Sequence, residues 1–322
     1  MYPVFRSALI AAALVLIAGA ASAAGLPITK KTISFKAKNT EITAAYPQTG
    51  NKAIDSVLAA YAAKVVADFK NEIKGDDANM PLPGASLYLD LSYTVERNDA
   101  QMLGIVFTED TFEGGAHPNH EFRTFNFLLP DGAQVFLGEI LDGKNGIDRL
   151  SRIVIAKLIK EIGTGDNAMS DKESIQRGAA PRADNFANFI ILPGKLHLYF
   201  SPYAVASYAA GPQETTVDLQ QLKDVIRADW RAPAPSFDCR KAKSNIEKAV
   251  CGDAKLARLD RQMAEAYESK LAEGEFDPDA AKKLKADQRA WLAATMKACN
   301  IAAPGPCLAN AYAARIAVIR TP

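Results

Sequence analysis

Two of the chain's three histidines lie in one short segment, Phe112 to Phe122, together with two carboxylates, Glu113 and Glu121. The histidines are His117 and His120, and Glu121 directly follows His120. Imidazole nitrogens and carboxylate oxygens are ligands that zinc accepts, so this segment is the first candidate for a metal-dependent hydrolase. A loop between two rigid strands is also a common place for a binding site of another kind.

The local sequence disfavours the usual zinc arrangement. Zinc hydrolases commonly place two histidines one turn apart on a helix. Here Pro118 separates the histidines, and Gly114 and Gly115 precede them, so we do not expect a helix. His197 falls on a predicted strand elsewhere. We therefore interpret the segment as a structural turn, expect no metal and no cofactor, and keep the hydrolase as an alternative hypothesis.

The sequence contains no other pattern that demands catalysis. We find no Gly-x-Ser-x-Gly elbow, no Walker phosphate loop and no EF-hand pattern. The cysteines are expected to be oxidised, which removes them as nucleophiles. We predict that the protein is not an enzyme and has no catalytic residues.

A second segment, Ser201 to Pro212, is rich in aromatic and small residues. Pro202 precedes Tyr203, and Ser207 precedes Tyr208. Tyrosine among small residues suits an anchor in a protein interface. The alternative is that both tyrosines pack inward as a lid on the sheet. We predict one partner-binding site formed by both segments; its residues are Gly114, Gly115, Ala116, His117, Pro202, Tyr203, Ser207 and Tyr208.

Alternating apolar residues predict an antiparallel sheet of several strands. The clearest alternation, from Leu87 to Val95, indicates a half-buried strand. The other predicted strands are Ile33–Phe35, Glu41–Tyr46, Gly104–Phe112, Phe122–Leu129, Val135–Leu137, Phe186–Leu192, Leu196–Phe200 and Thr215–Val217.

Apolar residues at helical spacing predict the helices. Asn51 is placed to cap the first helix, and Ile147 to Ile162 forms a second. Ser170 with Glu173 fits a capping box, and Asp218 is placed to cap a further helix. We predict an α+β first domain, an antiparallel sheet packed with helices, followed by a small disulfide-stapled all-α domain.

The amino terminus reads as a secretory signal peptide, residues 1–23. Arg6 precedes a short apolar run, and Ala21 to Ala23 is a small-residue cleavage site. Spanning a bilayer needs roughly 20 apolar residues, so this run is short for a transmembrane helix, and no later run is long enough. We expect a periplasmic or secreted protein that starts near Ala24, without a membrane span after cleavage.

The charge argues against nucleic acid as a partner. The chain has 38 basic and 37 acidic residues, and loss of Arg6 balances them. The part from Phe237 onward has 15 basic and 11 acidic residues, whereas the part from Ala24 to Ser236 has 22 and 26. The first domain is therefore weakly acidic, which favours a cationic partner.

A Pro- and Ala-rich segment, residues 232–236, predicts a semi-rigid linker between domains at 24–231 and 237–322. The second domain is composed of helix formers, with a capping box at Ser244 and Glu247 and a cap at Asp253. Its cysteines are Cys239, Cys251, Cys299 and Cys307. An even count in an exported domain predicts two disulfides. We expect Cys239–Cys251 and Cys299–Cys307; a crossed pairing between the first and last helices stays open.

Two motifs in the first domain resemble the RsiV-like family. They are Glu113-Gly-Gly-Ala-His117 and the run from Leu196 to Gly211, which includes Ser-Pro-Tyr203-Ala-Val-Ala-Ser-Tyr208. The resemblance covers roughly residues 30–230. Members include the extracytoplasmic part of a lysozyme-sensing anti-sigma factor and accessory domains of some peptidoglycan deacetylases. This chain has Pro118 where members commonly have Gly, and Ser207 where they have Pro.

The second domain resembles the LprI-like lysozyme inhibitor family over nearly all of residues 237–319. The matching residues are Phe237-Asp-Cys239, Glu247-Lys-Ala-Val-Cys251, Leu256-Ala-Arg-Leu259-Asp260, Tyr267, Gln288-Arg-Ala-Trp291-Leu292, Cys299 and Cys307-Leu308. Together the two resemblances imply a non-enzymatic envelope protein that binds lysozyme or a related muramidase, with inhibition as a further expectation. A peptidoglycan-binding module is the alternative, with the aromatic segment stacking on sugar.

Overall fold

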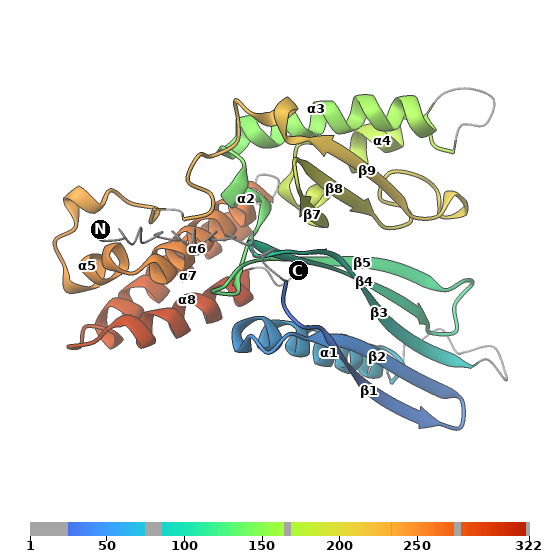
Figure 1. Ribbon diagram of the computed structural model, residues 1–322, viewed down its shortest axis with the longest axis horizontal. Helices are drawn as coiled ribbons and strands as arrows, with labels where there is room; N and C mark the ends of the chain where they lie inside the picture. The colour runs from blue at the N-terminus through green and yellow to red at the C-terminus, as the bar shows by residue number, and fades with distance from the viewer. Residues whose placement is uncertain (1–24, 75–85, 164–168, 233, 274–277, 320–322) are drawn as a thin grey trace, which may run out of the picture.

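A computed structural model describes residues 25–74, 86–163, 169–232, 234–273 and 278–319. The predicted signal peptide, residues 1–23, lies outside the described residues. Figure 1 shows an α+β region built from two sheets with a helical region beside it, which confirms the predicted fold class.

The larger sheet contains six strands in chain order, β1 to β6. They are β1 (Thr29–Ala37), β2 (Thr40–Gln48), β3 (Leu87–Asn98), β4 (Met102–Phe112), β5 (Asn119–Leu128) and β6 (Ala133–Gln134). All neighbours are antiparallel except β2 and β3, which are parallel. Helix α1 (Lys52–Glu72) lies between β2 and β3 in the sequence, and parallel strands need such a crossover connection.

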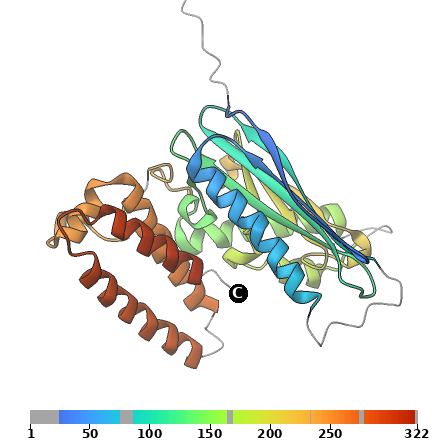
Figure 2. The same cartoon turned by 90° about the horizontal axis from the view of Figure 1, so that it is seen from below.

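Helix α1 covers one face of this sheet (Figures 1 and 2). Asn51 caps it as predicted, because its side chain accepts hydrogen bonds from the backbone N–H groups of Ala53 and Ile54. The apolar stripe of α1 then packs on alternate residues of the strands. The resulting core includes Ile54, Leu58, Ala62, Val65, Phe69, Leu89, Leu91, Ile105, Phe107, Phe125 and Phe127.

The smaller sheet contains β7 (Phe189–Leu192), β8 (Lys195–Phe200) and β9 (Gln213–Asp218) in that order. Helix α3 (Gly143–Ile162) covers its outer face, with α4 (Lys172–Gly178) alongside (Figure 1). Short 3₁₀ turns occupy Ala183–Phe186, Tyr208–Ala210 and Leu219–Leu222.

Two buried polar side chains of β5 join the two sheets. The amide of Asn126 donates to the Phe189 carbonyl and accepts from the Ile191 N–H, each at 2.8 Å. The Thr124 hydroxyl accepts from the Phe189 N–H at 2.8 Å. These bonds satisfy backbone groups along the edge of β7 that burial would otherwise leave unpaired. The smaller sheet is therefore fixed against the uncovered face of the larger one.

Three local predictions were wrong. The strand predicted at Val135–Leu137 ends earlier, because β6 covers only Ala133–Gln134 and Leu137 begins α2 (Leu137–Ile140). Helix α4 is capped by Asp171, which accepts from the Ser174 N–H, and not by Ser170. Asp218 makes no side-chain cap, and only a 3₁₀ turn follows it. For α4, Ser170 and Asp171 are neighbouring side chains that can each act as the cap, and the structure uses Asp171.

The carboxyl-terminal region is entirely helical apart from its connections. It contains a 3₁₀ turn at Cys239–Lys241, α5 (Asn245–Gly252), α6 (Ala254–Glu273), α7 (Pro278–Ala298) and α8 (Gly305–Ile319). The predicted capping box at Ser244 and the cap at Asp253 are both present.

The expected local disulfides are confirmed. Cys239 is bonded to Cys251 and Cys299 to Cys307. In the part of the chain that the structure describes, no helix has the length and apolar character needed to cross a membrane.

The segment between the two regions lies against α6. Ser236 donates to the Asp260 carboxylate from both its N–H and its hydroxyl, each at 2.7 Å. Arg261 donates to the carbonyls of Ala234 and Pro235 at 3.1 and 2.8 Å. We expected a semi-rigid spacer here. Instead, the described part of the segment is held to the helical region by hydrogen bonds.

Candidate functional site

The two segments selected from the sequence lie next to each other in the fold. Residues 113–118 connect β4 to β5, and residues 201–212 connect β8 to β9. Since the two sheets stack, the ends of β4 and β8 bring these connections together. Nε2 of His117 lies 3.1 Å from the hydroxyl oxygen of Tyr203. We call His117, Tyr203 and Tyr208 the aromatic patch.

Hydrogen bonds fix the orientation of the His117 ring. Its Nδ1 lies 2.9 Å from the Pro118 carbonyl oxygen, which can only accept a hydrogen bond. Nδ1 of neutral His117 therefore carries the proton, and Nε2 accepts from the Tyr203 hydroxyl. The Tyr208 hydroxyl donates to the same Pro118 carbonyl at 2.8 Å. The His117 ring stacks on Tyr208 with 3.8 Å between ring centroids.

The backbone of the patch adopts unusual conformations. Tyr203 has φ of 70°, in the left-handed region that side chains other than glycine rarely occupy. Its side chain is nonetheless 65% exposed. Gly114 has φ of 93°, which explains why glycine stands there. Strain on an exposed aromatic residue costs free energy without a compensating gain in burial, a pattern that is typical of functional positions.

The remaining predicted residues surround the aromatic patch. Ala116 and Ser207 are exposed, Gly115 and Pro202 are half-buried, and Gly114 is buried. The hypothesis of an inward-facing lid fails for Tyr203, which points outward. Tyr208 is half-buried between the His117 ring and the Pro118 carbonyl. The patch thus offers a rigid aromatic surface with its polar groups already paired.

The other histidines make separate hydrogen bonds. Nδ1 of His120 lies 2.7 Å from the Asp110 carboxylate, its cross-strand neighbour. His197 lies between the Tyr199 hydroxyl and the Glu214 carboxylate, at 2.9 Å from each. Among the described residues, no group of three or more His, Cys, Asp or Glu side chains is arranged to hold a metal ion. The arrangement therefore gives the hydrolase hypothesis no metal centre in this part of the chain.

Sequence reasoning missed the partners of these histidines. Asp110 faces His120 because β4 and β5 pair in one particular register. Glu214 reaches His197 across the β8–β9 pair. No local motif marks either carboxylate, and only correct strand pairing could have identified them.

A cluster of carboxylates lies on the α1 side of the larger sheet. Burial, followed by the negative charges of Glu121 and Glu72, raises the pKa of Glu109 to about 7. Burial is also the main cause of the raised pKa of Tyr61, whose hydroxyl is hydrogen-bonded to Glu109. Burial, followed by the charge of Glu113, raises the pKa of Glu72. These groups account for part of the acidic balance of the first domain.

The helical region is organised around Asp260. This buried carboxylate accepts both hydrogen bonds from Ser236 and one from the Tyr312 hydroxyl at 3.0 Å. Tyr312 in turn packs against Trp291. Asp260, a residue of the LprI-like motif, therefore joins α6, α8 and the connecting segment through Tyr312 and Ser236.

Comparison with protein families divides the chain into three matched segments. Residues 33–120 match the family model described as deacetylase PdaC, and residues 140–220 match a protein of unknown function family, DUF3298. Residues 239–318 match the model described as lysozyme inhibitor LprI. The chain therefore contains an LprI lysozyme inhibitor domain, as predicted. The RsiV-like assignment of the first domain is compatible with its matches and stays a prediction.

One curated relative is the peptidoglycan-N-acetylmuramic acid deacetylase PdaC of Bacillus subtilis. The chain is 29% identical to it over 185 residues, which are 58% of this chain and 38% of the relative. The chain thus spans well under half the length of that relative. The disulfides together with the LprI match indicate an extracytoplasmic location.

Two solved structures of DUF3298 proteins were also found. One, from Pseudomonas aeruginosa, has a TM-score of 0.48 and 12% identity, and covers 63% of this chain and 96% of its own. The other, from Bacteroides fragilis, has a TM-score of 0.43 and 15% identity, with coverages of 64% and 96%.

Proposed function

We propose that this chain is a periplasmic or secreted, non-enzymatic protein that binds and inhibits lysozyme-type muramidases. The observation that carries the proposal is the match of residues 239–318 to the lysozyme inhibitor LprI family. The domain boundaries at 24–231 and 237–322 and the signal peptide at 1–23 belong to the same proposal.

The aromatic patch supplies the proposed docking surface of the first domain. Tyr203 is exposed and strained, and His117 and Tyr208 hold it in place. A preorganised aromatic anchor loses little conformational entropy on binding. Its position at the end of two stacked sheets suits insertion into the glycan cleft of a muramidase. The acidic balance of this domain would speed encounter with a basic enzyme, an effect that fades as salt is added.

The proposal is tested by inhibition and binding assays of the full chain against c-type, g-type and bacterial lysozymes. We expect a complex with at least one of them at micromolar protein. Two variants then test the patch: Tyr203→Ala removes the anchor, whereas Tyr203→Phe keeps the ring and loses only the bond to His117. Tyr203→Ala should weaken binding about tenfold or more, and Tyr203→Phe much less. No complex with any of the three classes would refute the proposal.

A second candidate function is peptidoglycan binding, which the similarity to the B. subtilis PdaC favours. Sedimentation with purified sacculi separates the two functions, because a protein that only inhibits muramidases stays in the supernatant. A chain that sediments and leaves every lysozyme active would favour this second function.

A further inference from the structure

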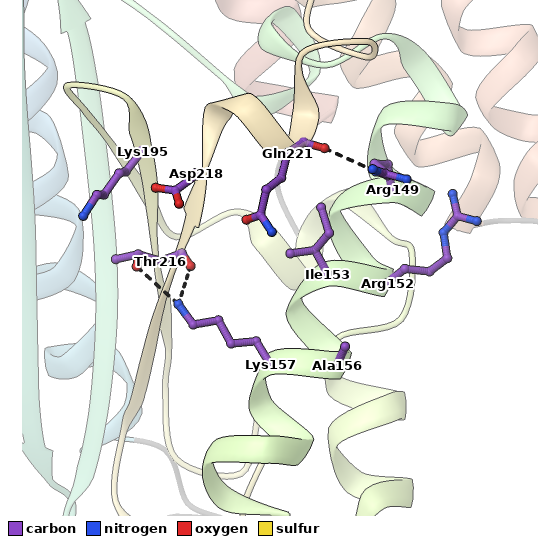
Figure 3. A pocket seen from close by; sticks show the side chains of 9 residues that line it. All are labelled: Arg149, Arg152, Ile153, Ala156, Lys157, Lys195, Thr216, Asp218 and Gln221. Carbon is purple, nitrogen blue, oxygen red and sulfur yellow. Dashed lines mark hydrogen bonds between the residues drawn. The ribbon is translucent and has the colours of Figure 1, made fainter.

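A strongly basic hollow lies beside the smaller sheet, between α3 and β9 (Figure 3). Its volume is about 750 Å³, within the range of small-ligand sites. Four cationic side chains line it, with one carboxylate, that of Asp218. The cations are Arg149, Arg152, Lys157 and Lys195. Neither muramidase binding nor the fold explains why these charges gather here.

Most of these cations keep their charged ends available. Within the described residues, Arg149 and Arg152 use only Nε, which donates to the carbonyls of Gln221 and Asp148 at 3.3 Å in each case. The side chain of Lys195 is exposed and makes no hydrogen bond or ion pair in the described part of the chain. Only the Lys157 ammonium is engaged: it donates to the Thr216 carbonyl at 2.6 Å and lies 3.9 Å from the Glu161 carboxylate. Guanidinium groups with free terminal nitrogens are suited to bidentate recognition of carboxylates.

A second, smaller hollow adjoins the first and has a different charge balance. Its volume is about 360 Å³, and it shares Arg149 and Arg152 with the basic hollow. Here the carboxylates of Asp148 and Asp224 balance the two arginines. Arg149 and Arg152 therefore lie between the basic hollow, which attracts anions, and the smaller hollow, whose carboxylates can also accept a cation. The apolar side chains of Ile153 and Ala156 line the basic hollow between its charged groups (Figure 3).

We propose that the paired hollows beside α3 bind the stem peptide of peptidoglycan. A stem peptide is short and carries several carboxylates, and a diamino acid within it adds one amine. Its carboxylates would pair with Arg149, Arg152 and Lys195, and its amine would lie toward Asp148 and Asp224. The small alanyl side chains of the stem suit the apolar stretch at Ile153.

The site is independent of muramidase binding, and it provides the peptidoglycan alternative with a ligand and a location. It lies on α3 and β9 and includes no residue of the aromatic patch. A chain that holds the wall peptide here would leave the aromatic patch available for the enzyme that attacks the wall. The two activities can therefore be separated by mutation.

The test is calorimetric titration of the full chain with a purified soluble stem tetrapeptide that contains a diamino acid. The parallel titrants are the sugar disaccharide without peptide, inorganic phosphate, and an acidic tetrapeptide without the amine. We expect the stem peptide to bind, the disaccharide and phosphate not to bind, and the amine-free peptide to bind more weakly. Affinity should fall steeply as salt rises.

The double variant Arg149→Ala, Arg152→Ala should bind the stem peptide at least about tenfold more weakly, since it loses two charge-assisted contacts. Arg289→Ala, which removes an exposed arginine of α7, is the matched control and should bind as the native chain does. An unchanged circular dichroism spectrum and an unchanged melting temperature show that the double variant is folded. Equal affinity in the double variant, phosphate binding as tight as stem-peptide binding, or no stem-peptide binding at millimolar concentration would each overturn the assignment.

Discussion

The carboxylate of Glu139 on α2 and the guanidinium of Arg258 on α6 form an ion pair 2.6 Å long that joins the α+β region to the helical region. Both side chains are buried, Glu139 completely. Arg258 also donates to the carbonyls of Trp230 and Arg231, and Gln262 donates to Glu139 at 3.0 Å. Because the N–H donors of Arg258 and Gln262 satisfy the buried Glu139 carboxylate across the junction, the two regions are docked and not merely tethered.

Breaking that pair should undock the regions. Glu139→Gln leaves the Arg258 charge buried without a counter-ion, and we expect a loss of about 3–5 kcal/mol in unfolding free energy. Urea denaturation followed by fluorescence should then show two transitions in place of one. The exposed pair of Lys64 and Asp68 is the control, and Asp68→Asn should change stability by less than about 1 kcal/mol. A Glu139→Gln protein as stable as the native chain would contradict the role assigned to this pair.

Asp260 should be the most sensitive position of the helical region. Asp260→Ala removes the acceptor of both Ser236 donors and of the Tyr312 hydroxyl, all buried or half-buried. We expect a loss of about 2–4 kcal/mol, against about 1 kcal/mol for Tyr312→Phe, which removes one donor. Trp291, which packs against Tyr312, reports the transition by fluorescence. Similar losses in the two variants would show that the Ser236 bonds contribute little.

Glu109 should make stability depend on pH. Burial is the main reason that its folded pKa rises from 4.5 to about 7, so the folded protein holds a proton that the unfolded chain releases. This contribution to stability is complete below about pH 4.5 and is lost as pH rises through 7.

The Glu109→Gln side chain stays neutral at every pH in this range. The variant should therefore unfold at a higher temperature than the native chain above pH 7. After allowance for partial solvent screening, we expect a gain of about 1–2 kcal/mol at pH 8 that shrinks below pH 5. Melting temperatures across this range provide the measurement. Glu41→Gln, at an exposed carboxylate, should show no such trend. A pH-independent difference between Glu109→Gln and the native chain would count against the assignment.

The strain at Tyr203 should make stability and binding change in opposite directions. Tyr203→Gly relieves the left-handed backbone at φ of 70° and should stabilise the chain by about 1 kcal/mol, although it loses the bond to His117. The same change removes the proposed anchor, so muramidase binding should weaken. Thermal melts and a binding assay on one preparation test both effects. If Tyr203→Gly binds muramidase as tightly as the native chain does, the strained backbone at Tyr203 has no role in binding.

Local sequence patterns determined most of the elements of this protein. Apolar spacing identified α1 and α3, alternation identified β3, and the side chains at Asn51, Ser244 and Asp253 cap helices as predicted. These features depend on residues within a few positions of one another, so the sequence contains the required information. The even cysteine count predicted two disulfides, whereas the structure decided for the local over the crossed pairing.

Only the tertiary structure decided how the pieces meet. Strand pairing decides that β2 and β3 are parallel and that the strands form two sheets. It also sets the register that places Asp110 opposite His120. The contact of His117 with Tyr203 and the pair of Glu139 with Arg258 join residues far apart in the chain. Such contacts form only when whole elements pack on a shared core, and no local spacing encodes which polar side chains that packing brings together.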